Sequence, residues 1–450
     1  MSKIIDAVSL VLVYQDEVFV IKRQNNLRAF PGYWAFPGGK VDADDGAYEF
    51  THQVFQKYPS QLMSALVREA QEELVIDLVS LATQGKVESL HHLGLAITPD
   101  FNPYRYATYF YKLTLKEKPQ MKVDNNEAAF AGWMSGQEVI ENYNEGKILA
   151  VPPVLKAYQR LGENPGLTEI MDLDFIFDKE NHVPMIESVV GIRQLMPLSN
   201  TLPPANRTNC FIIGDEGSEQ LIVDPSPKDK NEYKKLVNVI EKFEPTEIFI
   251  THHHKDHNEF ADVLARDLKL PMIMSAFTYD TLLKKRGKDF FDKIETEIVH
   301  EGDKVCKWLG KDIFIFEVPG HDRGQLAIAP KSMEWFFFFF LFQGVGTVVV
   351  GGEEGDMAEY FTTLKKVISL KPAVVFPSHG IGLGGTHILE KTLEHRQHRE
   401  DQVLEFYNNG VSPEQMLEKI YFDIPQGLKP YAMANITSHL QKLKNERKIS

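Results

Sequence analysis

The stretch "EIFITHHHKDHNEF" (Glu247–Phe260) joins an apolar run to a dense group of histidines. The apolar residues predict a buried strand, so the polar group follows the C-terminal end of that strand and leads into a helix. Within this group His252, His254, Asp256 and His257 offer imidazole and carboxylate ligands at the short spacing that suits zinc. The alternative interpretation is a solvated histidine cluster on the surface.

Two further histidines follow strand-like apolar runs. His321 comes after "IFIFEVPG" and His379 comes after "VVFPS". Three predicted strands therefore each lead into candidate zinc ligands, which favours the metal-site interpretation over a lone surface cluster.

This order of histidines resembles the metallo-β-lactamase fold superfamily, whose H-x-H-x-D-H signature is matched in full. The resemblance implies ligands for one or two Zn²⁺ ions: His252, His254 and His321 for the first, and Asp256, His257 and His379 for the second, with Asp256 also a candidate catalytic residue. The stretch "LPPANRTNCFIIGD" with "LIVDPS" is similar to the opening strands of that family. "HRQHREDQVL" (His395–Leu404) and the helical tail resemble the winged-helix-like C-terminal region of lactamase-like endoribonucleases.

One family ligand is missing from the run "EWFFFFFLFQGVGTVVVGG" (Glu334–Gly352). The superfamily normally places a Gly-Asp pair here, whose Asp bridges both metals, and the pair falls on Phe339 and Phe340. The whole stretch from Trp335 to Gly352 lacks Asp, Glu, His, Cys and Asn. The apolar run is also far shorter than the roughly 20 residues of a membrane-spanning helix, so it predicts a buried strand.

Three interpretations of the metallo-β-lactamase-like domain stay open. One zinc site survives with weak or altered hydrolysis, or a neighbour such as Asp322 or Asp356 replaces the missing ligand. In the third, the domain has become a scaffold or a binding surface. A damaged coding stretch is a further explanation of the phenylalanine run itself.

A second constellation lies in "FPGGKVDADD" and "SALVREAQEELVIDL". A predicted helix over Ser64–Leu74 carries one arginine and three glutamates: Arg68, Glu69, Glu72 and Glu73. Spacings of three and four place the glutamates on one face, where they repel unless a hard divalent cation offsets their charge. The turn at Gly38 and Gly39, a candidate cofactor-binding element, lets the backbone approach closely. The alternative is a solvated acidic helix face.

These residues resemble the Nudix box, G-x5-E-x7-R-E-U-x-E-E-x-G-U, with Gly39 at its first position. The chain departs from the pattern by an insertion between the glycine and the helix. Because of the insertion, the early Glu of the box falls on Asp45 or Ser60, and the late Gly is Val75. The insertion and "VPPVLKAYQRL" downstream look like the Nudix subgroup that hydrolyses CoA and related diphosphates.

The Nudix resemblance implies a site for Mg²⁺ or Mn²⁺ and a set of catalytic residues. Glu69, Glu72 and Glu73 would hold the metal, with one of them as general base, and Arg68 would orient them. Glu127, in "DNNEAAFAGW", lies where the family often has a further ligand or base. The implied substrate is a nucleotide diphosphate such as CoA, ADP-ribose or a dinucleotide.

The length of 450 residues and the punctuation "LGENPG" indicate a multidomain chain of mixed α+β and α/β class. We expect a Nudix α/β/α sandwich, a linker, a metallo-β-lactamase αββα sandwich and a small helical winged-helix-like unit, over residues 1–165, 166–185, 186–385 and 386–450. Two distant cysteines and an N-terminus that reads as strands rather than a signal peptide predict a cytoplasmic protein without a membrane anchor. A homodimer is possible within this fold family.

The net charge of −14 opposes non-specific binding to nucleic acid. Six basic residues nevertheless gather in the tail, at Arg396, Arg399, Lys442, Lys444, Arg447 and Lys448. They form either a solvated helix face or a contact for RNA phosphates. The resemblances leave two alternatives to a diphosphatase. One is an RNA-processing endoribonuclease, which the "HRQHREDQVL" match implies, and the other is a metabolite-sensing regulator, which resembles a Nudix domain joined to a winged-helix-like tail.

Overall fold

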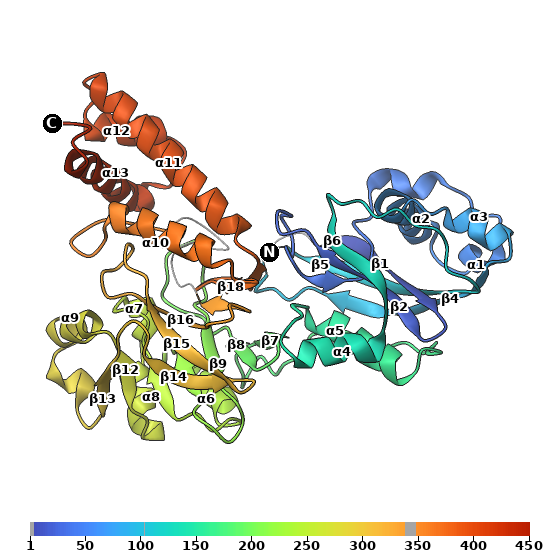
Figure 1. The fold of residues 1–450 in the computed structure, drawn as a ribbon, viewed down its shortest axis with the longest axis horizontal. Coiled ribbons are helices and arrows are strands. Elements are labelled where there is room, and N and C mark those ends of the chain that lie inside the picture. The colour runs from blue at the N-terminus through green and yellow to red at the C-terminus, as the bar shows by residue number, and fades with distance from the viewer. Residues whose placement is uncertain (1–3, 103, 338–347) are drawn as a thin grey trace. The chain divides into compact units, whose positions relative to one another are not determined.

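The computed structural model describes residues 4–102, 104–337 and 348–450. The chain divides into two compact units (Figure 1). Unit 1 comprises Met1–Phe177 with Ile186–Val190, and unit 2 comprises Asp178–Met185 with Gly191–Ser450. No helix in the described ranges is long and apolar enough to cross a membrane.

Unit 1 is built on a mixed six-stranded sheet in the order β3-β2-β1-β5-β4, with β6 paired to β2. Its strands are β1 (Ile5–Tyr14), β2 (Glu17–Arg23), β3 (Trp34–Ala35), β4 (Val87–Ile97), β5 (Tyr106–Leu115) and β6 (Ala128–Ser135). β1 runs parallel to β5 and antiparallel to β2. The two N-terminal strands expected from the sequence are β1 and β2.

Helices cover both faces of this sheet, because alternate residues of β1 point to opposite sides. Val8, Leu10 and Leu12 pack in one buried cluster with α2, and Val11 and Val13 pack in another with α5. The helices of unit 1 are η1 (Ala43–Ala47), α1 (Gln53–Gln56), α2 (Ser60–Leu74), α3 (Leu78–Thr83), α4 (Gly136–Asn144) and α5 (Pro152–Glu163). The expected α/β/α sandwich is therefore present (Figure 1).

Unit 2 contains two sheets. The first runs in the order β13-β12-β11-β10-β9-β8, and the second in the order β14-β15-β16-β17-β18-β19. The strands of the first are β8 (Ile192–Leu195), β9 (Cys210–Ile213), β10 (Leu221–Val223), β11 (Glu247–Phe249), β12 (Met272–Met274) and β13 (Thr296–Ile298), preceded along the chain by β7 (Met185–Val189). Those of the second are β14 (Lys304–Trp308), β15 (Lys311–Glu317), β16 (Leu326–Pro330), β17 (Phe336–Phe337), β18 (Val374–Phe376) and β19 (Leu383–Gly384).

Aromatic side chains fill the space between the two sheets. The ring of Phe211 on β9 lies 4.4 Å from that of Phe337 on β17 and 5.7 Å from that of Phe376 on β18. The start of the phenylalanine run is thus a buried strand, as its composition predicts. The expected alignment of Phe339 and Phe340 with the Gly-Asp pair lies outside the described residues.

Helices complete unit 2 on the outer faces of the sheets and at the C-terminus (Figure 1). They are α6 (Lys230–Ile240), α7 (Lys255–Asn258), α8 (Ala261–Leu268), α9 (Ala276–Arg286), η2 (Lys288–Phe291), α10 (Met357–Leu370), α11 (His387–Asn408), α12 (Pro413–Ile420), η3 (Gln426–Leu428) and α13 (Lys429–Asn445). A small apolar core of their own holds α11, α12 and α13 together: Val403, Met416, Ile420, Ile436 and Leu443. "TVVVGG" looked strand-like, but Val348–Val350 is not a strand.

Candidate metal sites

Arg68 on α2 gathers the carboxylates of the Nudix-like helix. Its Nη1 lies 2.7 Å from Glu69 Oε1 and 3.1 Å from Glu72 Oε2. Its Nε and Nη2 each donate over 3.0 Å to one oxygen of Asp45. The planar guanidinium thus holds several carboxylates in fixed positions, which a lysine could not do with a single ammonium group.

The pairing with Arg68 distinguishes the two candidates for the early acidic residue of the box. Asp45, on η1, is buried and makes the two-pronged contact. Ser60 instead begins α2, and its hydroxyl donates to the carbonyl of Tyr48. The inserted loop therefore brings Asp45, and not Ser60, into contact with Arg68.

Neither glycine of the Gly38–Gly39 pair leaves room for a side chain. A Cβ on Gly39 would lie 2.2 Å from Glu69 Oε1, and one on Gly38 would lie 2.2 Å from the carbonyl oxygen of Val8. Gly38 has φ +147, a conformation that favours glycine. Its amide donates to Glu73 Oε2 over 2.9 Å, so the turn and α2 are joined directly.

Burial and mutual repulsion perturb these carboxylates. Burial raises the pKa of Glu73 to about 8, and the charges of Glu69 and Glu127 add to the rise. Burial also raises the pKa of Glu69, which the neighbouring Arg68 only partly counteracts. Glu72 is exposed. A site that crowds carboxylates in this way is suited to a divalent cation, which would restore their charged forms.

The four groups of potential ligands whose atoms lie within 4.8 Å of one another are all in unit 2, for the residues the structure describes. Glu69, Glu72 and Glu73 are not among them: Arg68 contacts Glu69 and Glu72, whereas the Gly38 amide donates to Glu73. The carboxylates share one helix face but do not converge on one point.

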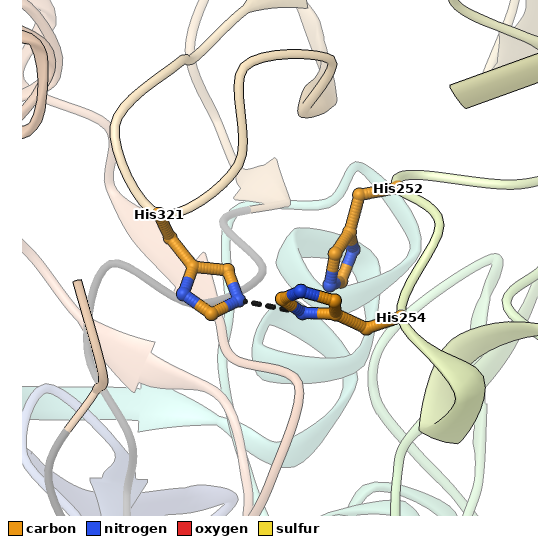
Figure 2. A group of neighbouring side chains, drawn as sticks. All are labelled: His252, His254 and His321. Atoms are coloured by element: carbon orange, nitrogen blue, oxygen red, sulfur yellow. Dashed lines mark hydrogen bonds between the residues drawn. The ribbon is translucent and has the colours of Figure 1, made fainter. Parts of the chain in front are cut away.

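The histidines of unit 2 do converge. His252 and His254 follow β11, and His321 follows β15; together they form one of the groups within 4.8 Å (Figure 2). Asp256, His257 and His379 form another. The structure thus assembles the two ligand sets expected from the sequence out of segments far apart in the chain.

Backbone carbonyls and a buried carboxylate fix the orientation of three rings. His321 Nδ1 lies 2.6 Å from the carbonyl oxygen of Val349, and His379 Nδ1 lies 2.7 Å from that of Arg207. A carbonyl can only accept, so both Nδ1 atoms carry the proton and both Nε2 atoms present a lone pair. Asp224 Oδ2 similarly accepts from His257 Nδ1 over 2.6 Å. Such contacts are those that hold metal-binding imidazoles in one tautomer.

Burial keeps most of these rings neutral. It lowers the pKa of His321 to about 3 and that of His379 to about 4, and it lowers the pKa of His252 well below its ordinary value. Burial also opposes protonation of His257, but the carboxylates of Asp224 and Asp256 outweigh it and raise its pKa. Neutral imidazole is the form that binds a metal ion.

The contact between His254 and His321 bears on whether the histidine cluster suits a metal ion. His321 Nε2 lies 2.9 Å from His254 Nδ1 (Figure 2), while His254 Nε2 lies 3.2 Å from Glu354 Oε2. His321 carries its proton on Nδ1, toward Val349, so its Nε2 accepts in the contact with His254 Nδ1. The imidazoles of His252, His254 and His321, with ligand atoms within 4.8 Å of one another, form a donor set that fits a zinc ion.

Three supporting residues were not foreseen from the sequence. Asp224, at the end of β10, is fully buried and also accepts from the amide and hydroxyl of Thr251. Glu354 contacts His253 and His254 and pairs with Lys285. The motif "LIVDPS" was a signal for Asp224, whereas nothing local marked Glu354 or Lys285.

The two residues considered as substitutes for the missing Asp differ in their surroundings. Asp322 Oδ2 lies 2.6 Å from His253 Nδ1, and Oδ1 accepts from the Gly324 amide. Asp356 caps the N-terminus of α10. Among the described residues, Asp322 joins His253, His254 and Glu354 in one of the groups within 4.8 Å, whereas Asp356 joins none of them.

Two of the six basic tail residues are not on a solvated face, contrary to expectation. Arg396 and Lys442 are both buried. Lys442 pairs with Glu400 over 2.7 Å, and Arg396 donates to the carbonyl of Val348. Arginine and lysine are seldom buried without partners, and the packing of α11 on α13 supplies them here.

Comparison with known proteins agrees with this architecture. The family model of the NUDIX domain matches residues 3–152, and that of the beta-lactamase associated winged helix domain matches residues 412–450. Two relatives named "Beta-lactamase-like protein 2 homolog" are also similar to this chain. The one from Drosophila melanogaster is 26% identical over 59% of this chain and 90% of its own length, and the one from Caenorhabditis elegans is 24% identical over 52% and 78%.

A solved structure, a beta-lactamase domain protein from Burkholderia ambifaria, is 16% identical with a TM-score of 0.50, covering 61% of this chain and 91% of that one. At this identity the likeness concerns the fold alone. The chain therefore has an N-terminal Nudix domain, a metallo-β-lactamase-like region and a C-terminal winged helix domain. The NUDIX domain match and the β-lactamase-like relatives support a hydrolase, and the histidine groups of unit 2 are suited to a metal ion.

Proposed function

We propose that the Nudix domain hydrolyses a diphosphate linkage in a nucleotide derivative of the CoA, ADP-ribose or dinucleotide type, with Mg²⁺ or Mn²⁺ as cofactor. The observation that carries this proposal is the arrangement around Arg68. Its guanidinium aligns Glu69 and Glu72 while Gly38 holds Glu73. We further propose domain boundaries near residues 165, 186 and 386.

We assign different catalytic roles to the carboxylates and the glycine turn of this domain. Glu69, Glu72 and Glu73 would hold the cation, which would supply Lewis acidity and offset the charge of the diphosphate. We propose that Glu127, whose charge contributes to the raised pKa of Glu73, accepts a proton from the attacking water. The Gly38–Gly39 turn leaves no side chain between the helix carboxylates and the backbone.

The test is the hydrolysis of CoA, ADP-ribose and dinucleotides by Glu72→Gln. This change keeps the size of an exposed side chain and removes one ligand charge, so the activity should be lost while the fold persists. Glu88→Gln, an exposed glutamate on β4, is the matched control and should be fully active. Retained activity in Glu72→Gln would show that the site is assigned wrongly.

For the second half we propose a zinc site on His252, His254 and His321 with weak or altered hydrolytic activity. This ligand set does not require the position occupied by Phe340. The carbonyl of Val349 fixes the tautomer of His321 and directs its Nε2 into this ligand set. Zinc there would act as a Lewis acid toward an ester or phosphodiester oxygen.

Zinc per full-length chain, measured by mass spectrometry after purification without chelator, tests this second proposal. One zinc ion, lost in His252→Gln, supports the three-histidine site. Two ions would mean that another residue replaces the missing Asp. No zinc would overturn the proposal and leave the catalytic activity with the Nudix domain.

A further inference from the structure

The segment Val348–Gly351 lies beside the histidine cluster and carries one of its contacts. The carbonyl of Val349 accepts from His321 Nδ1 over 2.6 Å. His321 enters the cluster from a different part of the chain than His252 and His254, as Figure 2 shows. The orientation of its ring therefore depends on where this carbonyl lies.

Two helices of the C-terminal unit hold the residues on either side of Val349. Arg396 Nη2, from α11, donates to the carbonyl of Val348. Asn435 Oδ1, from α13, accepts from the amide of Val350 over 2.8 Å. The same Oδ1 accepts from Arg396 Nη1 over 3.3 Å, which links the two holding residues to each other.

Both holding residues are almost completely buried, Arg396 at 1% and Asn435 at 4% exposure. Burying a guanidinium costs free energy unless its donors are satisfied. Here the partners are Val348, Asn435 and the face of Tyr360, whose ring centre lies 5.5 Å away. Arg396 and Asn435 thus direct their buried polar groups at this one stretch of backbone.

Gly351 provides an independent sign that the segment is pressed against α13. A Cβ on Gly351 would lie 2.6 Å from the carbonyl oxygen of Ala434, the residue before Asn435. A side chain at this position would push the segment away from the helix. The close approach of Gly351 and the hydrogen bond from Val350 to Asn435 therefore both hold the segment against α13.

We propose that Arg396 and Asn435 are positioning residues for the histidine metal site. They clamp Val348 and Val350, so that the carbonyl between them holds His321 with Nε2 directed at the metal. The inference rests on the proposed zinc site and extends it: the winged-helix tail completes that site rather than serving only as a module for binding a partner. The competing interpretation is that the two side chains merely satisfy buried backbone groups.

Asn435→Leu in the full-length chain separates these interpretations when paired with Asn435→Asp. Leucine removes the acceptor at similar size, whereas aspartate keeps an oxygen for Val350 and Arg396. We expect zinc affinity, measured by chelator competition, to fall about 10–100-fold in Asn435→Leu and to be largely retained in Asn435→Asp. Met416→Ala, in the core of the same helices, is the control and should change affinity less than about twofold even where it lowers the melting temperature.

The tautomer of His321 provides a second measurement that needs no metal. In ¹⁵N-histidine spectra of the metal-free protein, with His321→Gln as the assignment control, the wild type should show the proton on Nδ1. Asn435→Leu should show a mixture of tautomers. If that variant fails to fold, Gly351→Ala perturbs the same segment from the other side, and the same two changes are expected.

Unchanged zinc affinity and an unchanged His321 tautomer in the folded variants would overturn the inference. An equal loss of affinity in Met416→Ala would also overturn it, because the effect would then be one of stability. A wild type that binds no zinc would refute the proposed zinc site, and the tautomer alone would then decide the role of Asn435 and Arg396.

Discussion

Replacing Gly39 by alanine adds a single methyl group at the point where the glycine turn meets α2. The new carbon would lie 2.2 Å from Oε1 and 2.4 Å from the carboxyl carbon of Glu69. Non-bonded heavy atoms settle near 3.5 Å, so the carboxylate must retreat by roughly 1 Å. The backbone of Gly39 is outside the left-handed region, so alanine adds no conformational strain.

A displacement of this size is small for the fold and large for catalysis. Glu69 Oε1 is held 2.7 Å from Arg68 Nη1, and a shift of 1 Å would break that contact and move a proposed metal ligand. Misplacing a catalytic group by about 1 Å costs on the order of 100-fold in rate. Stability should fall by about 1–3 kcal/mol, the usual cost of one extra methyl group in a packed site.

The assay is kcat/KM for diphosphate hydrolysis at saturating Mg²⁺, with the melting temperature recorded alongside. Gly46→Ala is the matched control, because a Cβ at Gly46 meets nothing within 4 Å. We expect Gly46→Ala to match the wild type and Gly39→Ala to lose most of its activity while folded. Activity within twofold of wild type in Gly39→Ala, together with loss in Glu69→Gln, would refute the geometric reasoning.

Three further predictions follow from the contacts. The pKa of Glu73 is raised to about 8, and metal binding requires the charged form of this carboxylate. The apparent Mg²⁺ affinity should therefore rise about tenfold per pH unit up to about pH 8 and then level off. In calorimetric titrations, Glu73→Gln should abolish this dependence on pH. Asp224→Asn should weaken zinc binding about 10–100-fold in chelator competition, because Asp224 accepts from the Thr251 hydroxyl, which lies 3.0 Å from Nδ1 of the proposed ligand His252. Glu400→Gln should lower the free energy of unfolding of the helical tail by about 3 kcal/mol in urea, since it leaves the buried Lys442 without its closest carboxylate.

The sequence by itself determined the parts of each site that depend on local spacing. Helical periodicity placed Glu69 and Glu73 on one face of α2, and the pattern after β11 placed His252 and His254 at the end of a strand. Composition also predicted that Phe336–Phe337 belongs to a buried strand, since a short aromatic run bounded by turns is typical of one. These inferences need only the geometry of one helix or one strand.

Only the tertiary structure decided which partners hold those ligands. The insertion left Asp45 and Ser60 equivalent in sequence, and the fold alone brings Asp45 to Arg68. The carbonyl of Val349 that orients His321 has no sequence signature, because every residue carries a carbonyl. Arg396 looked like a solvated charge because local composition does not encode burial.

The physical reason is the same in each case. Spacing along the chain specifies which groups are available, but contacts between segments far apart depend on how sheets and helices pack. Asn435 and Val350 are far apart in sequence and meet only because α13 lies against that segment. The local sequence therefore determines which ligand groups are present, and the tertiary contacts of the folded chain determine how these groups are oriented.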